Sequence, residues 1–325
     1  MHPVPLERKP PKVYKTTMKK TVVLILTLII CLALTSCFLR RVVSGSSSIS
    51  GFTYSDSKKY SVGDFTYRAS DVDTVSVDYI SGTLKIVQSG SKTLKAAETS
   101  SERRSDAQTM HWYLDGKKLR IKFCESGYSG TVPDKTLTLE IPAGIDLEIG
   151  VTSGDVYFEN DLTAKNVNVG ATSGDLHIKT LTADDFESGS TSGDTFIDSL
   201  NAEDVKLGST SGNTDIGTLV AEEADFTSTS GNYRIKSASC ADIEGGSTSG
   251  SISIGLDYCS RLRIGCTSGN VELSSLPAGG ATVEYDKTSG TLHADGYTVK
   301  GGKMVYGNGD CRISVTTTSG NLTIR

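Results

Sequence analysis

Six carboxylates recur in pairs at a fixed interval, and paired carboxylates are the groups that perform acid and base catalysis on polysaccharides. The pairs stand at positions 184–185, 203–204 and 222–223, so each lies 19 residues from the next. The acidic stripe is defined here as Asp184, Asp185, Glu203, Asp204, Glu222 and Glu223. It fades at the next two intervals, where Ala241 and Ser260 occur. A solvated acidic surface is therefore favoured, and a carbohydrate-active β-helix enzyme remains the alternative.

Three aspartates at nearly the same interval, Asp155, Asp175 and Asp194, could hold a cation. Each follows a Ser-Gly dipeptide, and Asn occupies the equivalent position in several later repeats. Ca²⁺ needs six to eight oxygen ligands, and the glycine-rich nonapeptide of calcium-binding β-rolls does not occur in the sequence. We expect these residues to cap turns through hydrogen bonds from their side chains. The sequence therefore predicts no metal site. If one existed, these three aspartates would be the candidate ligands.

Cys240 and Cys259 are also 19 residues apart, at a position where earlier repeats have Ala. They should lie one strand spacing apart, either as a disulfide or as stacked buried thiols. No Cys and His spacing indicates a zinc site. With four His and one Trp in 325 residues, we expect neither a cofactor nor catalysis.

The elements that must position these residues are repeats. The tripeptide Thr-Ser-Gly begins at Thr152, Thr172, Thr191, Thr210, Thr229, Thr248, Thr267, Thr288 and Thr318. After each tripeptide, apolar residues come in pairs two positions apart, which is strand periodicity. Each repeat is interpreted as about three short strands. One coil cannot bury its apolar row alone, so stacked coils are required. The sequence predicts an all-β fold, a parallel β-solenoid over residues 150–325.

The Thr-Ser-Gly tripeptide itself is interpreted as the corner of a coil. Its Gly either has a positive φ or allows two backbones to approach closely. Residues 51–149 are predicted to form a β-rich N-terminal cap or degenerate coils, since Ser81-Gly82 resembles a corner. Asp115-Gly116 has the composition of a hairpin turn. Residues 96–109 are predicted to be a polar surface loop.

The N-terminus has the composition of a targeting segment. Lys19 and Lys20 precede the apolar residues 22–34, a run too short to span a membrane comfortably. It ends in Leu-Thr-Ser-Cys, which resembles a bacterial lipobox and makes Cys37 the predicted lipidation site. An ordinary signal peptide or an uncleaved anchor is the alternative. Residues 1–36 are then an upstream extension and signal peptide, and residues 37–50 are the lipidated Cys with a flexible tether.

Charge restricts the partners. The formal net charge is −5 for the full chain, and residues 37–325 carry 27 Lys/Arg and 37 Asp/Glu. This balance argues against nucleic acid as a partner and against electrostatic attraction to anionic lipid. Membrane attachment should therefore come from the lipid on Cys37.

The Thr-Ser-Gly-Asp/Asn corners, the stretch LTLEIPAGIDLEI and the closing YGNGDCRISV resemble the bacterial putative-adhesin family of unknown function over about residues 70–325. The resemblance implies an all-β, envelope-associated protein and supplies no catalytic residues. The lipobox departs from members that have a transmembrane helix. We expect a non-enzymatic lipoprotein that is exported and anchored outside the bacterial cytoplasmic membrane. Its expected partners are a glycan, a wall polymer, an envelope protein or a second copy of itself. A sensory module in envelope-stress regulation is a further alternative.

Overall fold

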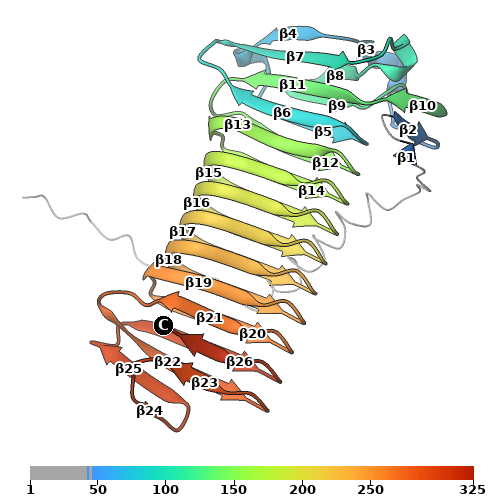
Figure 1. The fold of residues 1–325 in the computed structure, drawn as a ribbon. Helices are drawn as coiled ribbons and strands as arrows, with labels where there is room; N and C mark the ends of the chain where they lie inside the picture. Colours follow the sequence, from blue (N-terminus) through green and yellow to red (C-terminus); the bar gives the residue numbers. More distant parts are fainter. Residues whose placement is uncertain (1–41, 44–45) are drawn as a thin grey trace, which may run out of the picture.

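The computed structural model describes residues 42–43 and 46–325, and nearly all of its regular elements are β-strands (Figure 1). Most strands belong to one long, largely parallel stack, and a small separate sheet contains β1, β2 and β10. The predicted all-β parallel solenoid is therefore confirmed. The elements up to the first central coil are β1 Val42–Val43, β2 Ser46–Ile49, η1 Ser57–Lys59, β3 Ser61–Val62, β4 Phe65–Arg68, η2 Ala69–Asp71, β5 Thr74–Tyr79, β6 Thr83–Gln88, β7 Thr93–Ser100, η3 Asp106–Gln108, β8 His111–Asp115, β9 Lys118–Lys122, β10 Gly130–Pro133, β11 Lys135–Ile141, β12 Asp146–Val151, β13 Asp155–Thr163 and β14 Asn166–Ala171.

The central coils are four long strands that stack one upon another with a shift of 19 residues. They are β15 Leu176–Ser190, β16 Thr195–Ser209, β17 Thr214–Ser228 and β18 Tyr233–Ser247. Leu181 lies opposite Leu200, which lies opposite Leu219. The predicted short strands are thus joined into one 15-residue strand per coil, because the pairing with the neighbouring coil continues through the bend.

The interior is a set of columns in which equivalent side chains stack. In one such column, Leu181, Leu200 and Leu219 are each at most 1% exposed. Where one column holds a large ring, a neighbouring coil supplies a small residue: a Cβ atom on Gly245 would overlap the ring of Phe226. Burial of these alternating apolar positions drives the stacking, at roughly 25 cal/mol for each Å² removed from water.

The corner glycines are required by close backbone approach. A Cβ atom on Gly174, Gly193 or Gly212 would overlap the carbonyl oxygen of the equivalent Gly in the preceding coil. None of these three has a positive φ. Of the two reasons for Gly that the sequence suggested, the close approach of two backbones is therefore the one that applies to them. Hydroxyl groups complete the corner, as Ser190 Oγ donates to the Gly193 carbonyl oxygen at 2.7 Å.

The N-terminal part continues the same stack and then covers its end. β6 pairs in parallel with both β11 and β13, and β5 pairs in parallel with both β9 and β12. The first coil of the chain therefore lies between two coils that follow it in sequence. Antiparallel strands β3, β4, β7 and β8 surround this end (Figure 1). The hairpin expected at Asp115-Gly116 joins β8 to β9.

The C-terminal part has a matching arrangement. Its elements are β19 Ile252–Tyr258, β20 Arg261–Cys266, β21 Val271–Ser275, β22 Gly280–Lys287, β23 Leu292–Ala294, β24 Val299–Lys300, β25 Lys303–Gly307, β26 Cys311–Thr317 and β27 Leu322–Ile324. β26 lies between β20 and β22, and β27 lies between β21 and β23. The last coil of the chain is thus inserted inside the stack, and the antiparallel strands β24 and β25 lie at its outer end.

Candidate functional site

The predicted lipidation site, Cys37, lies outside the described residues, as do residues 1–36. Within the described ranges, no helix has both the length and the apolar character that a membrane span requires.

The predicted aspartate column forms a hydrogen-bonded ladder. Asp155 Oδ1 accepts the backbone N–H of Asp175 at 3.0 Å, and Asp175 Oδ1 accepts that of Asp194 at 2.8 Å. Asp194 Oδ1 accepts the N–H of Asn213 at 2.7 Å. One carboxylate oxygen of each residue is therefore occupied by the next coil. No group of three or more His, Cys, Asp or Glu in the described part of the chain is arranged to hold a metal ion.

The acidic stripe follows the strand surface, with Asp185 opposite Asp204 and Asp204 opposite Glu223. Asp204 is half-buried, whereas the other five members of the stripe are exposed to solvent. Carboxylates in such an open setting keep their hydration, which fits the solvated surface that the sequence favours.

The predicted cysteine pair belongs to a longer column. Cys240 lies opposite Ala221, and the pairing of Asp242 with Arg261 places Cys259 beside Cys240 in the next coil. Cys311, from the inserted last coil, lies in the neighbouring strand next to Cys259, because Arg312 pairs with Arg261. All three side chains are buried, and the thiols are free in the structure.

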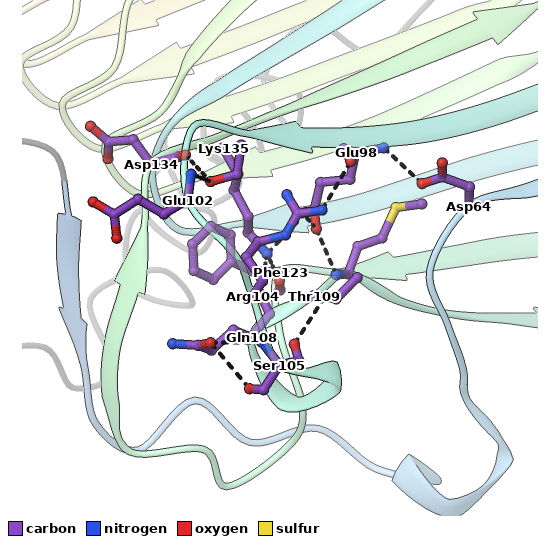
Figure 2. A network of polar contacts seen from close by, with 12 residues as sticks. Asp64, Glu98, Glu102, Arg104, Ser105, Gln108, Thr109, Phe123, Asp134 and Lys135 are labelled. Carbon is purple, nitrogen blue, oxygen red and sulfur yellow. Dashed lines mark hydrogen bonds and ion pairs between the residues drawn. The ribbon is translucent and has the colours of Figure 1, made fainter.

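A buried ion pair that the sequence analysis missed lies in the N-terminal part (Figure 2). Lys135 Nζ is 2.9 Å from Glu98 Oε1, and both side chains are fully shielded from solvent. Tyr79 donates to the same Glu98 oxygen at 2.5 Å. The other oxygen, Oε2, accepts the backbone N–H of Met110 at 3.0 Å and lies 3.4 Å from Arg104. We name these residues the Glu98–Lys135 network.

The Lys135 ammonium also donates to backbone groups inside the protein. Lys135 Nζ donates to the carbonyl oxygens of Gln108 and Phe123, and lies 4.0 Å from the centre of the Phe123 ring. Burial lowers the pKa of Lys135 to about 8, although the neighbouring Glu98 carboxylate opposes this change. Burial and Glu98 together raise the pKa of Tyr79. Because the network joins β5, β7 and β11 and its ion pair between Lys135 and Glu98 is fully shielded from solvent, we assign it a structural role.

The sequence does contain a signal for this network. Glu98 follows Leu94 and Ala96 at alternate positions, and Lys135 precedes Leu137 and Leu139 in the same way. A charged residue in an inward-facing position of a strand requires a partner. The prediction of a polar surface loop over residues 96–109 is therefore wrong in part, because β7 extends to Ser100 and Glu98 is buried within it.

Aromatic side chains form a second ladder, on the outside of the rod. The rings of Tyr157 and His177 stack with centroids 4.7 Å apart, and those of His177 and Phe196 with centroids 5.0 Å apart. These rings present their faces mainly to one another, so the ladder strengthens the contact between successive coils.

The outward charges change sign along the rod. Residues 150–257 carry 18 Asp/Glu and 5 Lys/Arg, whereas residues 258–325 carry 5 Asp/Glu and 7 Lys/Arg. The change occurs where Asp242 pairs with Arg261 and Glu244 pairs with Arg263 across neighbouring coils. The acidic surface thus ends at a row of arginines.

A groove of about 410 Å³ lies next to this row, and we name it the basic groove. It is lined by Arg261, Leu262, Arg263, Thr282, Glu284, Lys303, Arg312, Ile313 and Ser314. The short side chains of Ser314 and Thr282 stand opposite Arg263 and Arg312 in neighbouring strands, which leaves a depression between longer residues.

The electrostatics of the basic groove depend on Arg312. Arg261 and Arg263 are neutralised by Asp242 and Glu244, and Lys303 lies 2.9 Å from Glu284. Arg312 is exposed and has no ion-pair partner among the described residues. A guanidinium in this setting can form two parallel hydrogen bonds to a carboxylate, phosphate or sulfate. The groove is the candidate binding site, and the sequence could not reveal it because its strands come from distant segments.

Comparisons with solved structures support the fold. A putative adhesin from Parabacteroides distasonis matches with a TM-score of 0.54 and 11% identity, covering 85% of this chain and 99% of that one. A putative adhesin from Parabacteroides merdae matches with a TM-score of 0.51 and 13% identity, covering 82% and 96%. A protein named as a putative lipid binding protein, also from P. distasonis, matches with a TM-score of 0.50 and 13% identity, covering 81% and 97%.

At these identities the likeness concerns the fold alone. No curated protein has a sequence that matches this chain significantly. The model of the family described as Toastrack DUF4097 matches residues 72–325. That range includes the coils, the Glu98–Lys135 network and the basic groove, and it extends over most of the sequence. The chain belongs to the Toastrack DUF4097 family.

Proposed function

We propose that this protein is a non-enzymatic lipoprotein of the bacterial cell envelope that uses its solenoid as a rigid support for adhesion. Its lipid would be attached to Cys37. The tether would be shorter than the predicted residues 37–50, because Ser46–Ile49 form β2, which pairs with β10 and buries Ile49. The solved structures with this fold that are named as adhesins support the adhesive role. The envelope location is supported by the lipobox-like residues that end at Cys37.

The observation that carries the adhesive role is the basic groove beside Arg312. It is a recessed surface with a guanidinium that has no ion-pair partner among the described residues, and it adjoins the acidic stretch over residues 150–257. An anionic group of a glycan or wall polymer, such as a carboxylate or a phosphate, has the chemistry that this arginine recognises. The surrounding negative charge would repel polymers of uniform negative charge elsewhere on the rod, so binding should concentrate at the groove.

The test is a binding screen of the full chain against purified wall polymers and a glycan panel at low and physiological salt. We expect binding to an anionic polymer that weakens as salt rises, and a loss of about tenfold in affinity for Arg312→Ala. Arg234→Ala is the matched control, because Arg234 is an arginine on β18 that does not line the groove. Equal binding by both variants would exclude the groove, and turnover of a glycan would instead support the enzyme alternative.

The anchor is tested separately. Wild-type protein in bacterial cells should incorporate a labelled fatty acid and fractionate with membranes, whereas Cys37→Ser should do neither. A processed Cys37→Ser protein that stays bound to membranes would contradict lipidation.

A further inference from the structure

Three cysteines from three stacked coils form a column in the interior at the C-terminal end. The column begins with Ala183, Ala202 and Ala221 in the central coils and continues with Cys240 and Cys259. Cys311 then enters from β26, whose residue Arg312 lies opposite Arg261. The backbone of Cys311 is opposite that of Ser260, yet its side chain is buried whereas that of Ser260 is exposed. The thiol of Cys311 is therefore directed into the column.

The contacts within this column are selective. Cys311 stands one position from Cys259 in the neighbouring strand, and both thiols are buried. Cys240 instead donates to the carbonyl oxygens of Asp242 at 3.2 Å and Glu222 at 3.5 Å. Although Cys240 and Cys259 are neighbours, the Cys240 thiol is directed to these carbonyl oxygens, which leaves Cys311 as the buried thiol beside Cys259.

A disulfide between these two cysteines would connect the inserted last coil to the rest of the solenoid. The last coil, β26 and β27, is inserted between two coils that precede it in sequence. Its strands are held there by the ladder bonds and by buried side chains such as Ile313 and Val315. A bond between Cys259 and Cys311 would fasten this coil at its first residue to the main stack. It would close a loop of about 50 residues, which is long enough to restrict the unfolded chain strongly.

We propose that Cys259 and Cys311 form a disulfide in the exported protein and that this bond locks the inserted last coil into the solenoid. The compartment in which it forms rests on the export proposed above, since thiols of exported proteins meet oxidants. The position of Cys311 beside Cys259 does not depend on that proposal.

The chemistry is thiol–disulfide exchange with a disulfide oxidant, such as glutathione disulfide or an oxidised dithiol oxidoreductase. The thiolate of Cys311 attacks one sulfur of the oxidant, which forms a mixed disulfide and releases the other sulfur as a thiolate. The thiolate of Cys259 then attacks the Cys311 sulfur and releases the second thiolate. The oxidant gains two electrons, and its two thiolates take up the two protons that the cysteines lose.

The burial of the two thiols restricts when this exchange can proceed. Both side chains are at most 4% exposed in the folded protein. The reaction with an oxidant therefore belongs to folding, before β26 is enclosed.

The first experiment unfolds the full chain under reducing conditions and refolds it with glutathione disulfide. Free thiols are alkylated, and the protein is digested without reduction and analysed by mass spectrometry. We expect a linked peptide pair that contains Cys259 and Cys311 and separates on reduction. The oxidised protein should melt about 5 °C or more above the reduced protein. Alkylation of both cysteines, or a link between Cys240 and Cys259, would overturn the proposed pair.

Alanine variants provide the controls, because Ala occupies this column in the central coils. Cys259→Ala and Cys311→Ala should each abolish the redox-dependent shift in melting temperature, whereas Cys240→Ala should retain both the shift and the linked peptides. Circular dichroism of the reduced proteins shows whether each variant folds. A redox-dependent shift that survives in Cys311→Ala would contradict the proposal.

The second experiment separates this proposal from that of export. Thiols are trapped with an alkylating reagent in intact cells that produce the protein. A linked pair in cells supports both proposals. If the two cysteines link during refolding but are reduced in cells, the result would contradict both the exported location and a disulfide in the cell. It would still support Cys259 and Cys311 as the two cysteines that can pair.

Discussion

The carbonyl oxygen of Gly174 occupies the space that a Cβ atom on Gly193 would need. The same relationship recurs between the corner glycines of successive coils, from Gly154 and Gly174 to Gly269 and Gly320. The repeated glycine is thus a requirement of backbone spacing, and each corner depends on the one before it.

Gly193→Ala should destabilise the protein by about 3 kcal/mol, because the coils must separate locally to admit the methyl group. Gly189→Ala is the matched control, since a Cβ atom there would have no atom within 4 Å outside its chain neighbours. Urea unfolding measures both variants. Equal stability of the two would show that the corner does not depend on close backbone approach.

Asp194→Ala should cost about 1 kcal/mol, because the backbone N–H of Asn213 loses the acceptor that lies 2.7 Å away. Asp194→Asn should retain most of the stability, since an amide oxygen can accept the same bond. Asp198→Ala, an exposed residue of the same coil, serves as the control. Neither Ca²⁺ nor a chelator should shift the melting temperature, and a shift on addition of Ca²⁺ that Asp194→Ala removes would restore the metal-binding interpretation.

Lys135→Met should destabilise the protein by about 3–5 kcal/mol, because it leaves the buried Glu98 carboxylate without its cation. The double variant Glu98→Gln/Lys135→Met should lose less stability than the two single variants lose together. The reason is that no buried charge is then left unpaired. The four free energies of unfolding form a double-mutant cycle. Simple additivity would contradict the direct pairing seen in Figure 2.

Stability should also depend on pH through Lys135. Its pKa falls from 10.5 to about 8 on folding, so between these values the unfolded chain binds more protons than the folded protein. The contribution of Lys135 to the free energy of unfolding should therefore rise with pH across this window, by up to about 1.4 kcal/mol per pH unit. The buried thiols, whose pKa values are raised by burial, oppose this rise in every variant, so the effect is read as a difference from the reference below. The penalty for the buried charge is fully present below pH 8.

Urea titrations at about pH 7.5 and 9.5 measure this effect. The double variant Glu98→Gln/Lys135→Met provides the reference, and the difference in free energy of unfolding between wild type and this variant should rise with pH. Above pH 10 the raised pKa of Tyr79 reverses the trend, because the unfolded tyrosine loses its proton first. A slope shared by both proteins between pH 8 and 10 would exclude Lys135 as its source.

Much of the fold could be predicted because the relevant signals are local and repeated. The interval between Thr191 and Thr210 equals the shift in pairing between β15 and β16. The interior positions of Leu181 and Leu200 follow from alternation, which requires no knowledge of distant residues. The ladder of Asp155, Asp175 and Asp194 was likewise accessible, since a short polar side chain after a Gly commonly bonds to nearby backbone.

The order of coils at the two ends could not be predicted in this way. The corner at Thr318 stacks on that at Thr267, and the corner at Thr288 then stacks on Thr318. All three have the same tripeptide, so nothing local distinguishes their neighbours. In the structure this order leaves β22 at the outer end, where the antiparallel strands β24 and β25 pair with it and with one another.

The sequence alone therefore determined the period of the coils, the inward and outward sides of their strands and the small residues at their corners, because each follows from bonding within one repeat and its copy. Tertiary structure alone decided that Cys311 meets Cys259, that Lys135 meets Glu98 and that Arg312 stands beside the basic groove. The physical reason is that these contacts join segments whose separation in sequence carries no regular period, and their energies depend on burial that exists only after the coils have stacked.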